Sequence, residues 1–345
     1  MKNEGEMIMK KKITALMLTL LLVMSLAACG GTPAESPAPE STDTPVEASG
    51  TTYTVGICQL MKHVALDSAT QGFCDKLTEL VEANGDSVVF DLQNAAGEPT
   101  TCATICNQFV SSDVDLILAN ATPALQAAMA ATNTIPVLGT SITDYATAMG
   151  VSDWTGATGI NVSGTSDLAP LDEQAALIKE LFPDAKTIGI LYCSAEPNSQ
   201  YQSDVITASL TELGYTCKNY TFSDSNDIQS VATAAVSECD VIYVPTDNTA
   251  ASNASLIGNV CIPAGVPVVT GEEGTCAGCG VATLSISYYD LGVATAEMAY
   301  EVLVNGADPA EMDIRFAPQV TKKYNADICA SLGIEPPADA VAIEQ

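Results

Sequence analysis

From residue 52 onward the chain alternates short apolar runs with longer amphipathic stretches. The runs TYTVGICQL, SVVFDLQ, DLILANA and IPVLGTS are almost continuously apolar, which is typical of buried strands. The stretch after the first run places Phe73, Leu77, Leu80 and Val81 on one helical face and stops at Gly85. Strands of this kind separated by helices predict an α/β fold with a parallel sheet covered on both sides.

The same order of elements then recurs. TVGICQL at 54–60 matches TIGILYC at 187–193, and DLILANATPA at 115–124 matches DVIYVPTDNTA at 240–250. TIPVLGT at 134–140 matches GVPVVTG at 265–271, so the three offsets all fall between 125 and 133 residues. About 280 residues also exceed the usual size of a single hydrophobic core. We therefore expect two lobes of one architecture.

Polar side chains follow the predicted strands in both halves. Since ligands bind beyond the carboxyl ends of the strands in open α/β sheets, we expect these residues to meet in one cleft between the lobes. The candidates of the first half are Gln59, His63, Asn120, Thr122, Thr143 and Asp144. Those of the second half are Ser194, Glu196, Asn198, Ser199, Thr246, Asp247, Asn248, Glu272 and Glu273.

The chemistry of these candidates suits a small zwitterion. Thr122-Pro123 and Asp247-Asn248 have the pattern of helix starts, whose free N–H groups can hold a carboxylate without arginine. The chain has a single arginine, Arg315. Asp144, Asp247 and Glu272 could then accept a ligand ammonium. In the alternative interpretation Thr122 and Asp247 cap their own helices, Asp144 stabilises a turn and Glu272 is solvated.

The N-terminus predicts export. Lysines precede the apolar run ITALMLTLLLVMSL, and LAAC at 26–29 fits a lipoprotein signal site, so residues 1–28 are expected to be removed and Cys29 lipidated. Residues 29–51, rich in Pro, Ser, Thr, Glu and Gly, are expected to form a flexible linker. The mature chain would keep 8 basic and 40 acidic residues of the 12 and 42 in the whole sequence. Such a surface repels nucleic acid.

No pattern indicates catalysis, a cofactor or a metal site. The one histidine is His63, and neither a zinc-protease motif nor a phosphate-binding loop nor a dinucleotide fingerprint is found. Cys276 and Cys279 form a C-x-x-C pair, interpreted as a surface disulfide or two idle thiols, with a thiol oxidoreductase as the alternative. Cys102 and Cys106 share one helix face, which usually means core.

Several motifs in fixed order resemble the substrate-binding lipoproteins of ABC transporters that include tryptophan and tyrosine uptake proteins. They are QLMKHVALDSATQGF, NAAGEPTT, ANATPALQA, SITD, GTSDLAP, SAEPNSQ, VPTDNT, GEEG and SYYDLG, and they span residues 52–334. The resemblance implies a type I periplasmic-binding-protein fold: two Rossmann-like lobes with parallel sheets, a three-crossover hinge, and closure around a small molecule. It departs from the family in the stretch around Trp154 and in CAGC after GEEG.

The resemblance also implies a set of ligand-binding positions. They are Thr122, Asp144, Asn198, Ser199, Asp247 and Glu272, with Asp167 near a crossover. Gln59 and Thr246 join them as strand-end residues, and Leu60 is expected to support an aromatic ligand, with Tyr145, Trp154 and Tyr192 nearby in sequence. The expected N-terminal lobe comprises residues 52–163 plus 274–305, and the C-terminal lobe 164–273 plus 306–334. Residues 335–345 are expected to be a tail.

The sequence thus predicts a lipid-anchored, extracytoplasmic, monomeric receptor that delivers an aromatic amino acid to an ABC permease. A nucleoside, a sugar or a branched-chain amino acid is the alternative ligand, since the fold hosts all of these. A sensor lipoprotein that serves a signalling receptor is a further alternative.

Overall fold

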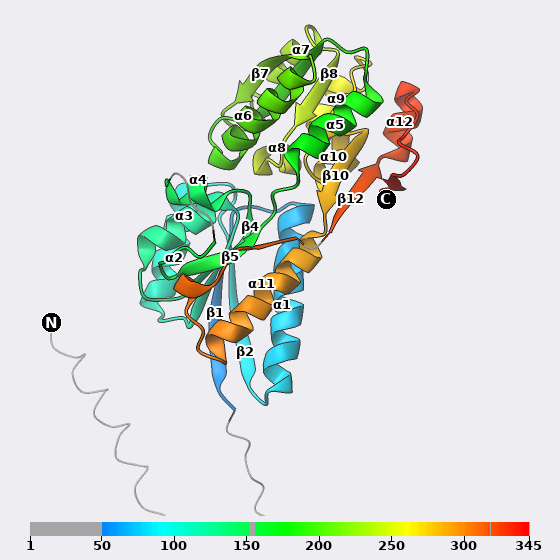
Figure 1. Ribbon diagram of the computed structural model, residues 1–345. Coiled ribbons are helices and arrows are strands. Elements are labelled where there is room, and N and C mark those ends of the chain that lie inside the picture. Colours follow the sequence, from blue (N-terminus) through cyan, green and yellow to red (C-terminus); the bar gives the residue numbers. More distant parts are fainter. Residues whose placement is uncertain (1–49, 152–155, 318, 345) are drawn as a thin grey trace, which may run out of the picture. The chain divides into compact units, whose positions relative to one another are not determined.

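The computed structural model describes residues 50–151, 156–317 and 319–344, whose helices and strands are labelled in Figure 1. The signal segment, Cys29, the linker and Trp154 lie outside the described residues. Residues from 48 onward form one compact unit, which is built on two sheets.

The first sheet has the strand order β11-β5-β4-β3-β1-β2, and its described strand pairs are all parallel. With the helices packed on it we call it the N-lobe, which comprises the described residues of 50–166 and 288–317. Its elements are β1 (Thr52–Gln59), α1 (Val64–Ala83), β2 (Ser87–Asn94), α2 (Pro99–Ser111), β3 (Leu116–Asn120), α3 (Thr122–Ala131), β4 (Val137–Ile142), α4 (Tyr145–Met149), β5 (Val162–Ser166), α11 (Tyr288–Leu303), the 3-10 helix η1 (Pro309–Glu311) and β11 (Arg315–Phe316).

The second sheet has the order β13-β12-β10-β9-β8-β6-β7, in which β12 alone pairs antiparallel to a neighbour among the described strands. We call it and its helices the C-lobe, the described residues of 168–286 and 319–344. Its elements are α5 (Leu171–Leu181), β6 (Thr187–Cys193), α6 (Pro197–Glu212), β7 (Thr216–Phe222), α7 (Ile228–Val236), β8 (Val241–Val244), α8 (Asn248–Ser252), α9 (Ala254–Cys261), β9 (Val268–Thr270), α10 (Glu273–Cys279), β10 (Ala282–Ile286), β12 (Val320–Tyr324), α12 (Ala326–Leu332) and β13 (Val341–Ala342).

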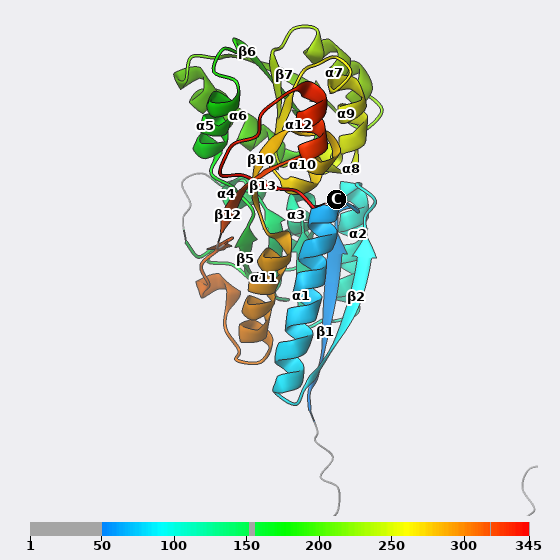
Figure 2. The ribbon, with the colours of Figure 1, turned by 90° about the vertical axis from the view of Figure 1, so that its right-hand side faces the viewer.

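Both sheets are covered on both faces, as the apolar strands require. In the N-lobe, α1 and α11 pack on one face through a core that includes Phe73, Leu77 and Val302, and they lie side by side in both views (Figures 1 and 2). Helices α2 and α3 cover the other face around Phe109 and Leu125. In the C-lobe, α5, α6 and α12 cover one face and α7, α9 and α10 the other.

The repeated sequence pattern corresponds to repeated structure. The order β2-β1-β3-β4-β5 in the N-lobe matches β7-β6-β8-β9-β10 in the C-lobe. Asp115 accepts a hydrogen bond from the Thr54 N–H at 2.6 Å, and Asp240 accepts one from the Thr187 N–H at 2.9 Å. Each of these aspartates also donates its own N–H to the carbonyl of the same threonine. The predicted duplication is confirmed, down to the carboxylate that begins each central strand.

The chain passes between the sheets after β5, after β10 and after β11, which gives the three predicted crossovers. The predicted lobe boundaries are wrong for several segments. Residues 164–166 belong to β5 of the N-lobe sheet, and 315–316 pair with them as β11. Residues 274–286 belong to the C-lobe because β10 pairs with β9 and β12. The expected tail is also partly structured, since β13 adds a strand beside β12.

A close approach of two strands shapes the N-lobe edge. The pairing of β4 with β5 shifts register between Gly139 and Ile142. Gly164 in β5 has φ of 140°, and a Cβ at this position would lie 2.1 Å from the carbonyl oxygen of Gly139. Only glycine fits this backbone.

Candidate functional site

The carboxyl ends of strands from both lobes border a cavity of about 620 Å³. N-lobe residues that line it include Leu60, Met61 and Pro123, and C-lobe residues include Cys193, Glu196 and Thr249. Of the predicted ligand-binding residues, Leu60 lines this cavity directly. Glu272 and Asp144 each line another, smaller cavity, and most of the remaining predicted residues are buried at strand and helix ends.

Three of the predicted carboxylates cap helices. Asp144 accepts the N–H of Thr147 at 2.6 Å at the start of α4. Glu272 accepts the N–H of Gly274 at 2.6 Å and also bonds Thr275 at the start of α10. Asp247 accepts from Ala250 N–H at 2.7 Å in α8 and from Cys193 N–H at 2.6 Å at the end of β6. The capping alternative therefore holds for Asp247. It is wrong for Thr122, whose hydroxyl caps no helix, and the solvated alternative is wrong for Glu272, which is 2% exposed.

The carboxyl group of Asp247 has a raised pKa. Burial, together with the nearby carboxylate of Glu196, raises its pKa to about 7, against the hydrogen bonds from Ala250 and Cys193. Ser199, a predicted ligand residue, also bonds Asp247. Asp247 and Ser199 thus tie β6, α6 and α8 together at the C-lobe edge.

Asp167 is the predicted carboxylate that keeps a free oxygen. It follows β5, is 4% exposed, and accepts the Tyr288 hydroxyl at 2.9 Å on Oδ2. Its Oδ1 is buried without a hydrogen-bond partner. Burial, together with the nearby carboxylate of Glu272, raises the pKa of Asp167 to about 6, against the lowering effect of the Tyr288 and Thr143 hydroxyl groups. Tyr288 also contacts Thr246 of the C-lobe, so Asp167 lies close to both lobes.

Besides Thr207 Oγ1 within α6 and Thr283 Oγ1 within β10, four further polar atoms of the described residues are buried without a partner, and these four lie at strand ends or helix starts. They are Asn120 Oδ1 at the end of β3, Thr122 Oγ1 at the start of α3, Ser141 Oγ near the end of β4, and Asn198 Oδ1 at the start of α6. Register pairs Asn120 with Thr140 and Ile142 with Ser166, so the N-lobe members lie along one sheet edge. Unpartnered buried polar groups are costly, and each one needs an explanation such as an absent ligand.

The backbone is strained at this edge. Ala121 has φ of 92° and Ser141 has φ of 56°, values that non-glycine residues seldom adopt. Such strain is concentrated at functional sites. Ser141 was missed by the sequence reasoning, because nothing in SITD shows that the residue before Ile142 has a left-handed backbone. Asn120 was considered as a strand-end residue, and its position at the end of β3 is confirmed.

Other predicted residues have structural partners. Gln59 accepts from Thr70 Oγ1 at 2.7 Å and donates to Asp67 at 2.6 Å, which ties β1 to α1. Tyr145 is buried and donates to the Gly139 carbonyl at 3.1 Å, within the N-lobe core. Tyr192 donates to Gln200 at 2.9 Å. These two aromatic side chains therefore contribute to packing.

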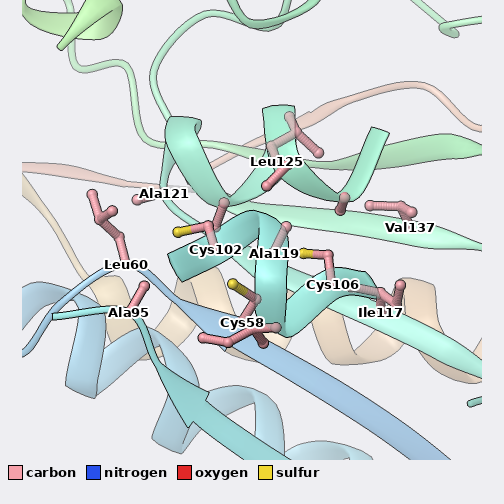
Figure 3. Packing of buried hydrophobic residues seen from close by; sticks show 14 of the residues in the cluster. Cys58, Leu60, Ala95, Cys102, Cys106, Ile117, Ala119, Ala121, Leu125 and Val137 are labelled. Carbon is pink, nitrogen blue, oxygen red and sulfur yellow. The ribbon is translucent and has the colours of Figure 1, made fainter. Parts of the chain in front are cut away.

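The cysteines of the described residues are free thiols, so Cys276 and Cys279 form no disulfide. Both lie in the interior, at 0% and 1% exposure, and burial raises the pKa of each thiol. The surface-disulfide interpretation is wrong because α10 turns both side chains into the C-lobe, where they remain free thiols. Cys102 and Cys106 are in the core, as predicted, and their sulfur atoms gather with that of Cys58 between β1 and α2 (Figure 3).

The helices and the metal-binding types of side chain in the described ranges bear on other classes of protein. No helix there is long and apolar enough to cross a bilayer. Nor do the described histidine, cysteine and acidic side chains form a group of three or more that could hold a metal ion.

Comparison with known proteins places this geometry in a family. Residues 54–343 match the family model described as ABC transporter substrate binding protein. The chain is 35% identical over 330 residues to a tyrosine-binding protein of Clostridioides difficile (strain R20291), covering 95% of this chain and 94% of that protein.

Solved structures agree with this result. A Streptococcus pneumonia ABC domain in complex with L-Trp has a TM-score of 0.80 and 34% identity, covering 85% of this chain and 100% of that one. A ligand-free, open substrate-binding protein with adhesive properties from Clostridium difficile has a TM-score of 0.65 and 33% identity, with 85% and 99% covered. The chain belongs to the ABC transporter substrate-binding protein family.

Proposed function

We propose that this substrate-binding protein captures an aromatic amino acid between its lobes and delivers it to an ABC permease. The observation that carries the proposal is the set of five buried, unpartnered polar atoms at the strand ends. The set contains both acceptors and hydroxyl donors, so it can pair with the ammonium and the carboxylate of one zwitterion.

The acceptors suit an ammonium group. Asp167 Oδ1 would be its main partner, because Tyr288 already fixes the other carboxylate oxygen at 2.9 Å. Asn120 and Asn198 offer amide oxygens, since their amide nitrogens are engaged: Asn120 Nδ2 donates to the Leu66 carbonyl at 2.9 Å, and Asn198 Nδ2 donates to Thr246 O at 3.3 Å. A charged donor between these oxygens would satisfy all three.

The hydroxyl groups suit a carboxylate. Thr122 Oγ1 and Ser141 Oγ can each donate one hydrogen bond. Thr122 also begins α3, a helix of 10 residues whose N-terminal N–H groups favour an anion. These hydroxyl and N–H donors would hold the carboxylate without an arginine, and the chain has a single arginine.

The side chain of the ligand would occupy the cavity. Leu60, Met61, Pro123 and Cys193 supply apolar walls, and its 620 Å³ exceeds the volume of an amino-acid side chain. The relatives point to an aromatic ligand, because one is a tyrosine-binding protein and another binds L-Trp. At similar identity, the fold matches the L-Trp complex better than the ligand-free open protein, which supports hinge closure as the capture step.

The remaining features complete the proposal. ABC substrate-binding proteins act outside the cytoplasmic membrane, and they generally bind their solute without transforming it. A diacylglycerol on Cys29 would anchor the chain, and residues 29–51 would tether it at the membrane surface. The protein is proposed to act as a monomer.

A calorimetric binding panel tests the proposal. L-Tyrosine, L-tryptophan and L-phenylalanine should bind, whereas isoleucine, uridine and rhamnose should not. Asp167→Asn should weaken binding strongly because it removes the negative charge that faces the ammonium. Binding of a sugar or nucleoside alone, with affinity unaffected in the Asp167→Asn variant, would refute both the ligand class and the assignment of Asp167.

A further inference from the structure

A side-chain hydrogen bond links the two lobes at the rim of the cleft. His63 Nε2 lies 3.2 Å from Asn248 Oδ1. His63 follows β1 and begins α1 of the N-lobe, and Asn248 is the first residue of α8 in the C-lobe. Both side chains are half-buried. The bond can exist only while the two lobes are close together.

The orientation of the Asn248 amide is fixed from the C-lobe side. Its Nδ2 donates to Glu196 Oε2 at 2.7 Å, which leaves Oδ1 to face His63. Because an amide oxygen only accepts, His63 Nε2 must be the donor. The oxygen of the Asn248 side chain is therefore already oriented to accept this hydrogen bond from His63 when the lobes meet.

Glu196 connects this contact to the proposed ligand site. The carboxylate is 5% exposed and accepts from Asn248 N–H at 3.0 Å and from Thr249 N–H and Oγ1 at 2.8 Å each. It also accepts from Asn198 Nδ2 at 3.3 Å. Asn198, whose Oδ1 is unpartnered, and Asn248 are thus held by the same buried carboxylate.

We propose that His63 and Asn248 form an interlobe latch that prolongs the closed, ligand-bound state. The inference rests on the proposed function and deepens it: His63 is a positioning residue that contacts Asn248 of the C-lobe and not the ligand. A ligand that orders Asn198 also steadies Glu196, and through it the Asn248 oxygen that His63 bonds. The latch lowers the rate of reopening and leaves the encounter with ligand unchanged.

A double-mutant cycle on ligand dissociation tests the latch. His63→Ala and Asn248→Ala should each raise the dissociation rate and Kd of L-tyrosine about 5-fold, the loss of one hydrogen bond. The double variant should show about the same 5-fold change, because the two residues act through one bond. His63→Gln, which keeps a donor, should recover most of the affinity. Multiplied effects in the double variant, or unchanged dissociation in His63→Ala, would overturn the latch.

Matched controls separate the latch from general damage. Asn305→Ala removes a similar amide–carboxylate bond, Asn305 Nδ2 to Glu301 at 2.8 Å, within the N-lobe alone, and it should leave dissociation unchanged. The ligand-free unfolding midpoint of His63→Ala should equal that of Asn305→Ala, because each variant loses one side-chain hydrogen bond. A midpoint below that of Asn305→Ala, with faster association as well as dissociation, would indicate a structural role and overturn the proposal.

The latch can be tested even if the protein binds no aromatic amino acid. A wild type that binds none of the aromatic amino acids contradicts the proposed function, and small-angle scattering of the ligand-free protein then decides the latch. A larger radius of gyration in both single variants, with no further increase in the double variant, supports the contact. Equal radii in wild type and variants overturn it.

Discussion

Binding of the ligand should weaken about tenfold when the pH falls from about 7.5 to about 5, because a proton competes with the ligand ammonium for Asp167. The carboxyl group has a usual pKa of 3.8, and burial raises its pKa to about 6 in the ligand-free protein. Since a bound ammonium favours the ionised carboxylate, ligand binding lowers this pKa and expels the proton.

The magnitude follows from the raised pKa. Apparent Kd scales with one plus the ratio of protonated to ionised Asp167, which is about 1.03 at pH 7.5 and about 11 at pH 5, a difference of roughly 1.4 kcal/mol. Stability of the ligand-free protein changes in the opposite direction. Because the folded pKa lies above the unfolded one, the free energy of unfolding should rise as the pH falls from above 6 toward 3.8.

Titration calorimetry with L-tyrosine in two buffers of different ionisation enthalpy measures the affinity and the number of protons released on binding. About one proton should be released per ligand below pH 6, and almost none at pH 7.5. Asp167→Asn should abolish the pH dependence and bind more weakly at pH 7.5. Asp247, with a pKa of about 7, would instead centre the change near neutral pH. An affinity that stays constant between these pH values, or a pH dependence that survives in Asp167→Asn, would refute the assignment.

Three further substitutions test other parts of the structure. Thr122→Val keeps the side-chain shape and removes the unpartnered hydroxyl, so ligand affinity should fall about 5-fold with the urea midpoint unchanged; full affinity by calorimetry would contradict the carboxylate role. Gly164→Ala should lower the free energy of unfolding, measured in urea, by about 2 kcal/mol or more, because its Cβ would lie 2.1 Å from the Gly139 carbonyl oxygen. The control Gly306→Ala, at a φ of 71° with open space around it, should lower it by about 1 kcal/mol. Equal losses would count against the strand contact. Joint replacement of Cys276 and Cys279 by serine should lower stability by about 1–3 kcal/mol but leave ligand affinity unchanged, and the parent should not reduce a disulfide substrate; weaker binding at unaltered stability would point to a functional pair.

Much of the fold could be predicted because it depends on local pattern. Apolar runs of strand length between amphipathic stretches are visible in one sequence. The similar offsets of three matched runs, one of them containing Asp115 and Asp240, predicted the duplication. The lobe boundaries were less predictable. The sequence of Ala282–Ile286 would suit a strand in either sheet. Its place in the C-lobe depends on pairing with β9 and β12, which the sequence does not show.

The site was only partly predictable for a related reason. Sequence identifies polar residues after strands, but whether a carboxylate caps a helix or stays free depends on tertiary contacts. Asp247 and Asp167 both follow strand-like runs, yet Asp247 accepts two backbone N–H groups while Asp167 keeps one oxygen unpartnered. The role of Glu196 was equally hidden, because its partners Asn248 and Thr249 are more than 50 residues away.

The thiols of the interior have a consequence for how the protein is made and handled. The described part of the chain contains 11 free cysteines, most of them buried, and no cross-link between them. The native state of this part therefore depends on non-covalent interactions and needs no catalyst of disulfide formation. Reducing agents should be harmless to it, whereas an intermolecular disulfide at one of its buried cysteines in a stored sample would report that molecules have opened.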